Sequence, residues 1–137
     1  MNVQPWSEVF VNGTFDILHP GHLALLKFAK SKGEWLTIGI DSDQRVKKLK
    51  GESRPVNDEY ARKEMLLALS VVDDVYIFNS DEQLCDLIKH INPDTMIVGS
   101  DYEDKPVIGS QYAKQLMFFE KINGYSTTKI IKNITNR

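Results

Sequence analysis

The strongest constraint on the fold is the alternation of short apolar runs with longer segments of helical periodicity. Runs of strand length occupy residues 8–11, 35–40, 75–78, 95–98 and 116–120. Segments with helical spacing or helix-capping residues lie between or after them, near residues 23–30, 57–72, 80–91, 110–115 and 126–134. Such alternation with short connections favours right-handed βαβ crossovers. The sequence therefore predicts an α/β fold, with a Rossmann-like open parallel sheet of about five strands and helices on both faces.

Two segments carry more detailed expectations. Residues 41–55 are polar and rich in Lys without a steady period, so a loop or a short irregular helix is expected there. The helix that follows is expected to be capped by Asn57 or Asp58 and to run to Val71 or Val72. Its expected inward-facing stripe is Ala61, Met65, Ala68, Leu69 and Val72.

Length, charge and cysteine content limit the class of protein. A chain of 137 residues is expected to form a single domain, residues 1–137, with one core. Its 17 Lys and Arg against 19 Asp and Glu give a net charge of −2, which argues against binding to nucleic acid or to an anionic membrane. One cysteine excludes an internal disulfide and fits a reducing compartment. Without a signal-like start or an apolar run of membrane length, the chain is expected to be soluble and cytoplasmic.

The turn after the first predicted strand has the features of a phosphate-binding site. Residues 11–22, VNGTFDILHPGH, lead from that strand directly into a helix. Amide groups in the first turn of a helix have no intrahelical partner and, with the helix dipole, attract anions. Gly13 and Gly21 allow the backbone to approach a ligand closely. His19 and His22 are three residues apart and would point to one side, which suggests phosphate chemistry.

Other interpretations of the two histidines remain open at this point. Either histidine alone is more often a helix cap or a solvated surface residue. Zinc ligation is disfavoured because the only other histidine is His90, the only cysteine is Cys85, and no HExxH pattern is present. No metal ligands are therefore predicted among the side chains, and the histidine pair is interpreted as part of a phosphate site.

Further loops are expected beside this turn, because ligands of parallel sheets bind at the carboxyl ends of the strands. These loops are the Lys-rich segment, residues 99–102 and residues 124–129. A second helix start near Thr127 would face the same crevice, which suits a polyphosphate. The Walker pattern and the GxGxxG fingerprint are both absent. Positive charge for phosphoryl or nucleotidyl transfer could come from His19, His22, Lys48, Lys50 and Lys129.

Two of these motifs resemble those of a known superfamily. Residues 19–22, HPGH, resemble the HxGH signature, and residues 126–129, STTK, resemble the closing motif, of the cytidylyltransferase-like nucleotidyltransferases. Residues 48–57 are most similar to the adenylyltransferase domain of ADP-heptose synthases, while the size and residues 126–130 are equally similar to glycerol-3-phosphate cytidylyltransferase. The resemblance implies attack of a substrate phosphate on the α-phosphate of a nucleoside triphosphate, release of pyrophosphate, and a divalent cation, usually Mg²⁺.

The resemblance also implies roles for individual residues. His19 and His22 would stabilise the pentacoordinate α-phosphate, and Lys48 and Lys50 would supply catalytic positive charge beside them. The implied nucleotide site consists of Gly13, Thr14, Phe15, His19, His22, Gly99, Asp101, Gly124, Ser126, Thr127 and Thr128. The implied acceptor site consists of Asp16, Lys48, Lys50 and Arg62.

The favoured interpretation is transfer of AMP from ATP to a heptose 1-phosphate, and the alternative is transfer of CMP to glycerol 3-phosphate. Lys121 stands where glycerol-3-phosphate cytidylyltransferases have an arginine, which weakens the cytidylyl interpretation. The presence of all these motifs argues against a nucleotide-binding module without turnover. Kinship suggests a homodimer and a sugar kinase as partners. The kinase would be a separate chain, because these residues contain no kinase segment.

Overall fold

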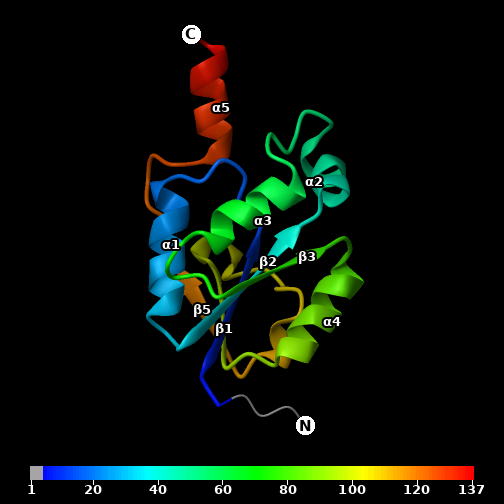
Figure 1. The fold of residues 1–137 in the computed structure, drawn as a ribbon, viewed down its shortest axis with the longest axis vertical. Helices are drawn as coiled ribbons and strands as arrows, with labels where there is room; N and C mark the ends of the chain where they lie inside the picture. The colour runs from blue at the N-terminus through cyan, green and yellow to red at the C-terminus, as the bar shows by residue number, and fades with distance from the viewer. Residues whose placement is uncertain (1–4) are drawn as a thin grey trace.

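The computed structural model describes residues 5–137 as a parallel sheet flanked by helices (Figure 1). The strands are β1 (Glu8–Gly13), β2 (Trp35–Asp41), β3 (Asp74–Phe78), β4 (Thr95–Gly99) and β5 (Gln115–Phe119). They lie in the order β3-β2-β1-β4-β5, and every neighbouring pair is parallel. The prediction of a Rossmann-like parallel sheet of about five strands is confirmed.

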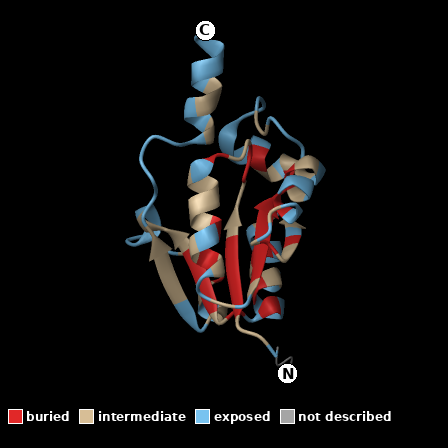
Figure 2. Ribbon diagram, turned by 60° about the vertical axis from the view of Figure 1, so that its left-hand side comes forward, coloured by how far each residue is buried: buried red, intermediate tan, exposed pale blue. Residues whose placement is uncertain are grey.

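Helices cover both faces of the sheet. They are α1 (Pro20–Lys30), α2 (Asp43–Lys50), α3 (Glu59–Leu67), α4 (Asp81–Ile91) and α5 (Thr127–Thr135), with short 3₁₀ turns η1 (Ser100–Tyr102) and η2 (Ser110–Tyr112). Leu26 of α1 and Leu66 of α3 belong to the core on one face, and Leu84 and Ile88 of α4 belong to the core on the other. Figure 2 shows the buried residues concentrated along the central strands and the helix surfaces that cover them.

The helix starts follow the capping residues in the sequence. Asp58, Ser80 and Ser126 each cap a helix, because each side chain accepts a hydrogen bond from the amide three residues later. The end of α4 is also determined by nearby residues, because Asn92 adopts the left-handed conformation with φ 51° immediately before Pro93. The predicted cap at Asn57 or Asp58 is confirmed at Asp58, and the predicted helices near residues 80–91 and 126–134 are confirmed as α4 and α5.

The prediction for residues 41–55 is only partly correct. The first half forms a regular helix, α2, which is capped by Ser42 and buries Val46. Only residues 51–58 form a loop. The many lysines of α2 obscured the helical period, because a short helix at the sheet edge needs only one buried apolar side chain to pack.

The predicted inward-facing stripe of α3 is wrong at its centre. Met65 is 55% exposed, while Arg62 and Leu66 are the buried residues of this helix. The helix also ends at Leu67, before the predicted end near Val72. Arg62 can occupy an inward position because its guanidinium finds hydrogen-bond acceptors there, which a pattern of apolar residues does not reveal.

The candidate site lies at the carboxyl edge of the sheet, at the top of Figure 1. The chain goes from β1 to β2 and β3 on one side, and then to β4 on the other side of β1. This reversal makes the ends of β1 and β4 the topological switch point, where such sheets bind ligands. Helix α5 projects from the same edge (Figure 1). Within residues 5–137, no helix has the length and apolarity that a membrane crossing requires.

Candidate active site

The N-terminus of α1 is built by the two histidines themselves. His19 is the N-cap residue, and its Nδ1 accepts hydrogen bonds from the amides of Gly21 (3.1 Å) and His22 (3.4 Å). The Nδ1 of His22 in turn accepts from the His19 amide at 3.3 Å. This reciprocal arrangement is a capping box with imidazoles in the usual places of Ser and Glu. Pro20 completes the turn at the first helical position.

His19 and His22 lie on one side of the turn, as their spacing predicted, and their rings stack against each other. Their centroids are 3.7 Å apart with an interplanar angle of 23°, and the ring of Phe15 packs 5.2 Å from His22. Since both Nδ1 atoms accept hydrogen bonds, the network assigns the proton of each neutral ring to Nε2. The two Nε2–H groups are therefore free to donate to an anion.

Burial keeps this pair uncharged. Desolvation, the neighbouring His19 and the charge of Lys50 lower the pKa of His22 from 6.5 to about 4, against a smaller opposing effect of Asp16. Burial also lowers the pKa of His19. The sequence suggested that the histidines could supply positive charge, but the lowered pKa values favour the neutral form of both rings near pH 7. Lys50 and the N-termini of α1 and α5 are positive groups near this turn.

Thr14 connects the end of β1 with α2. Its Oγ1 lies 3.4 Å from Asp41 Oδ2 and 3.2 Å from the Nζ of Lys50. Asp41, the last residue of β2, is also paired with Arg45 at 2.7 Å. Partial burial and the nearby charge of Arg54 lower the pKa of Lys50. Both predicted loop lysines are exposed residues of α2, and Lys50 is the one whose side chain reaches the turn, at Thr14.

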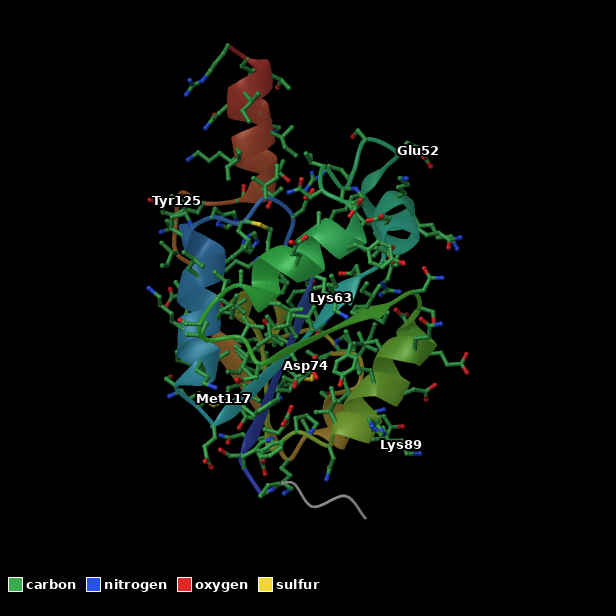
Figure 3. The ribbon with its side chains drawn as sticks, viewed as in Figure 1. Glu52, Lys63, Asp74, Lys89, Met117 and Tyr125 are labelled. Atoms are coloured by element: carbon green, nitrogen blue, oxygen red, sulfur yellow. The ribbon has the colours of Figure 1, made fainter. Side chains whose placement is uncertain are left out.

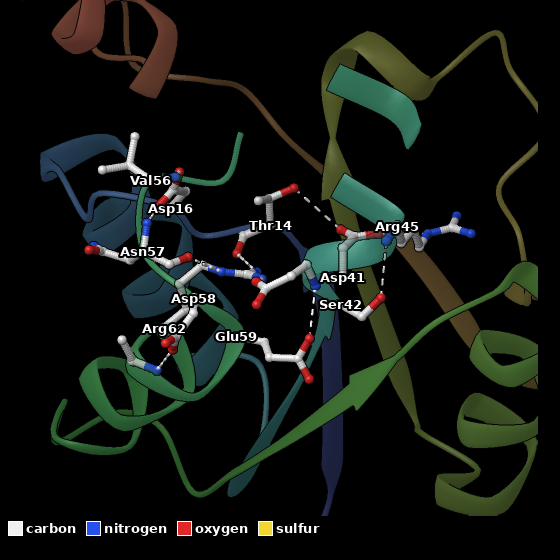
Figure 4. A network of polar contacts seen from close by, with 12 residues as sticks. Thr14, Asp16, Asp41, Ser42, Arg45, Val56, Asn57, Asp58, Glu59 and Arg62 are labelled. Carbon is white, nitrogen blue, oxygen red and sulfur yellow. Dashed lines mark hydrogen bonds and ion pairs between the residues drawn. The ribbon is translucent and has the colours of Figure 1, made fainter. Parts of the chain in front are cut away.

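A buried polar cluster joins the same turn to the loop before α3 (Figure 4). Asp16 is 1% exposed, and its carboxylate accepts from the amides of Val56 (2.6 Å) and Asn57 (2.9 Å). Arg62 is also 1% exposed, and it donates to the carbonyl oxygens of Asn57 (3.0 Å) and Thr14 (2.9 Å) and to Asp43 (2.9 Å). Both side chains thus hold the turn and the loop in place.

The end of β4 carries a second polar pair. Asp101 forms an ion pair with Lys121 at 3.3 Å. Gly99 lies directly beneath this pair, because a Cβ at that position would lie 2.6 Å from Asp101 Oδ1. Lys121, which replaces the arginine of the cytidylyl relatives, is therefore bound to the acidic residue expected to face the nucleotide.

The N-terminus of α5 lies above that of α1. Thr127 donates through its hydroxyl to the backbone carbonyl of Asp16, 111 residues away in sequence. Gly124 adopts a positive φ of 93° in the loop that leads there. The ring of Tyr125 is nearly parallel to that of His19, with centroids 6.3 Å apart. Figure 3 shows Tyr125 beside the start of α1. The two predicted helix starts therefore meet, with hydroxyls, imidazoles and a lysine around them.

Comparison with known proteins agrees with this arrangement. A family model described as cytidylyltransferase-like matches residues 10–133, which include both helix starts. The chain belongs to the cytidylyltransferase-like family.

Known proteins align with most of this chain. The chain is 47% identical over 126 residues to the Bifunctional protein HldE of Campylobacter fetus. The matched region covers 92% of this chain but only 27% of that protein. It is 49% identical to the protein of the same name from Sulfurimonas denitrificans, again over 92% of this chain and 26% of the relative. The chain therefore spans about a quarter of the length of these relatives.

Solved structures show the same fold. A lipopolysaccharide core biosynthesis protein from Thermoplasma volcanium has a TM-score of 0.69 and 25% identity, with 84% of this chain and 98% of that chain covered. A pantothenate synthetase from Thermus thermophilus has a TM-score of 0.59 at 14% identity, with 93% of this chain and 64% of that chain covered. The second similarity shows the fold alone.

Some site residues of this cytidylyltransferase-like domain were not found by sequence reasoning. Asp41 could have been noticed as a carboxylate at the carboxyl end of a buried strand, which is where ligand-facing side chains collect. Arg54 does not follow a strand. It lies in a polar loop, and its hydrogen-bond partner, Thr128, is 74 residues away in the sequence. Within residues 5–137 no group of three or more His, Cys, Asp or Glu residues is arranged to hold a metal ion.

Proposed function

We propose that this domain transfers AMP from ATP to a heptose 1-phosphate and releases pyrophosphate. The observation that carries the proposal is the stacked pair of neutral imidazoles at the N-terminus of α1, close to the start of α5, whose Nε2–H groups form no hydrogen bond within residues 5–137. The acceptor is inferred from the similarity of residues 48–57 to ADP-heptose synthases and from the HldE relatives. Transfer of CMP to glycerol 3-phosphate is the alternative.

The reaction needs no covalent intermediate with the protein. An oxygen of the acceptor phosphate attacks the α-phosphorus, the bond from that phosphorus to the bridging oxygen breaks, and pyrophosphate leaves with the electron pair. Donors fixed in advance where negative charge builds up lower the barrier most effectively. His19 and His22 have this property, because their backbone hydrogen bonds and mutual stacking fix both rings before substrate binds.

Cationic side chains complete the proposed site. Lys50 lies at Thr14, where it would neutralise charge on the phosphates, and Lys48 would approach from the exposed side of α2. Asp16 and Arg62 belong to the proposed acceptor site through position, since they fix the loop that would surround the incoming phosphate. Gly13 and Phe15 would line the nucleotide side, together with Gly99, Asp101, Gly124, Ser126, Thr127 and Thr128.

A divalent cation fits this site only as a companion of the triphosphate. Mg²⁺ commonly binds through one or two carboxylates together with substrate phosphates. Asp101 is the proposed carboxylate, and its exposed ion pair with Lys121 can open without leaving a buried charge. The bound cation would neutralise the leaving pyrophosphate.

The relatives are nearly four times as long as the matched region, so the complete reaction scheme can involve a second activity. We propose a sugar kinase as the supplier of the heptose 1-phosphate, and a homodimer as the assembled form. Lys121 argues against the cytidylyl alternative, because a lysine cannot replace the bidentate fork of an arginine.

Pyrophosphate release tests the proposal directly. ATP and CTP are each combined with heptose 1-phosphate, glycerol 3-phosphate and glucose 1-phosphate in the presence of Mg²⁺. We expect release with ATP and heptose 1-phosphate at a rate well above every other pair. Preference for CTP and glycerol 3-phosphate would establish the alternative, and binding of triphosphate without release from any pair would indicate a nucleotide-binding module.

A further inference from the structure

Arg54 is a cation in this edge of the fold that the proposed mechanism leaves without a role. It lies in the loop between α2 and α3, and its Nη1 lies 3.4 Å from the hydroxyl of Thr128 in the first turn of α5. Its Nε is buried and has no hydrogen-bond partner within residues 5–137. A buried donor without an acceptor is uncommon in folded proteins and calls for an explanation.

Arg54 and Lys50 are neighbouring cations, and the carboxylates of Asp41 and Asp16 oppose the effect of Arg54 on Lys50. Within the described part of the chain, neither Arg54 nor Lys50 forms an ion pair with a carboxylate, and the charge of Arg54 is one reason why the pKa of Lys50 is lowered. Asp16 lies nearby, but its carboxylate oxygens accept from the amides of Val56 and Asn57. An anion that binds between two neighbouring cations relieves their repulsion, so this pair favours an anionic ligand.

We propose that Arg54 binds the terminal phosphates of the nucleoside triphosphate, together with Lys50 and the N-terminus of α5. This inference rests on the proposed function and identifies which part of the substrate the loop before α3 recognises. The contact with Thr128 places the guanidinium at unpaired first-turn amides, which favour anions. A polyphosphate tail also matches two cations and a helix end better than a monophosphate ester does, because it carries more negative charge.

The binding of inorganic tripolyphosphate, measured by calorimetry without Mg²⁺ or acceptor, tests the inference. We expect Arg54→Gln to raise the Kd of the otherwise intact protein by about tenfold to a hundredfold, the loss typical for a charge-assisted hydrogen bond. Arg54→Lys keeps the charge without the fork and should give a smaller rise. Arg137→Gln, the same change beyond the far end of α5, is the matched control and should leave the Kd unchanged.

Two comparisons separate this role from others. If Arg54 only anchors α5 to the loop, Arg54→Gln lowers the melting temperature of the free protein but leaves the tripolyphosphate Kd as in wild type, and the inference is wrong. A larger loss of affinity for glucose 1-phosphate than for tripolyphosphate would assign Arg54 to the acceptor, which also contradicts it. Neither readout depends on turnover, so the inference can stand even if no acceptor supports pyrophosphate release.

Discussion

The two helix N-termini that meet at the carboxyl edge are held in different ways. Helix α1 packs on the sheet with Leu26 and Ala29 fully buried, and its cap residue His19 is only 9% exposed. Helix α5 has no buried residue, and Ile134 is 65% exposed (Figure 2). Its start is tied to the domain by side-chain contacts of Thr127 and Thr128. The first terminus is part of the core, whereas the second depends on a few polar contacts.

This difference suggests a division of labour between the termini. Donors that must stabilise charge during the reaction work best when their positions are fixed beforehand, which the packing of α1 provides. Segments with few buried apolar contacts open at low free-energy cost, which makes the start of α5 suitable for a terminus that closes on a bound tail. Substitutions at α1 should therefore affect kcat most, and substitutions at α5 should affect KM most.

The largest effect is expected from the histidine pair. His19→Ala or His22→Ala removes one fixed donor, so kcat should fall on the order of a hundredfold or more. His90→Ala, at the exposed end of α4, is the control and should retain wild-type turnover. Circular dichroism establishes that each variant is folded. Wild-type kcat in both site variants would remove the proposed mechanism.

The Asp16 carboxylate holds the loop before α3 to the turn that leads into α1, and a substitution can remove this contact. Asp16→Asn places an amide NH₂ where two backbone N–H groups now donate, so one buried donor loses its acceptor. The free energy of unfolding should fall by roughly 2–3 kcal/mol. Asp104→Asn is a matched change at an exposed position of the same sequence and should have almost no effect. Equal stability of the two variants in urea denaturation would show that the carboxylate does not hold the loop.

The sequence predicted those parts of the site that are determined locally. The alternation of strands and helices, the helix starts near Asp58, Ser80 and Ser126, and the side shared by the two histidines depend on residues a few positions apart. A repeating apolar or capping pattern encodes such features.

The features that the sequence did not predict depend on contacts between residues far apart in the chain. Arg62 is buried because its guanidinium donates to the carbonyl oxygen of Thr14, 48 residues earlier. The face of α3 that carries Arg62 therefore packs on the domain, and Met65 lies on the exposed side. The contact of Arg54 with Thr128 spans 74 residues. No local period reports such acceptors, so the face of α3 and the anchoring of α5 could be learned only from the assembled structure.

The pH dependence of stability tests whether the histidines of α1 are neutral. The pKa of His22 is about 4 in the folded protein and 6.5 in the unfolded chain. Between pH 4 and pH 6.5, therefore, the unfolded state binds a proton that the folded state does not. The free energy of unfolding should therefore be constant above pH 6.5 and fall below it, by about 2 kcal/mol at pH 5. His22→Gln should lack this component. Identical slopes for wild type and His22→Gln between pH 5 and pH 6.5 would show that His22 titrates normally.

The smallest expected effect lies at the start of α5 and separates the two termini most sharply. Thr127→Val keeps the shape of the side chain but removes the hydroxyl that donates to the carbonyl of Asp16. Loss of about 1 kcal/mol from the bound position of α5 should raise the KM for ATP about fivefold. Because the histidines stay in place, kcat should change less than about twofold. Thr135→Val, at the other end of α5, removes a hydroxyl bonded only within the helix and should leave both constants unchanged. A fall in kcat at unchanged KM would mean that α5 acts on the reacting phosphate rather than on the bound tail.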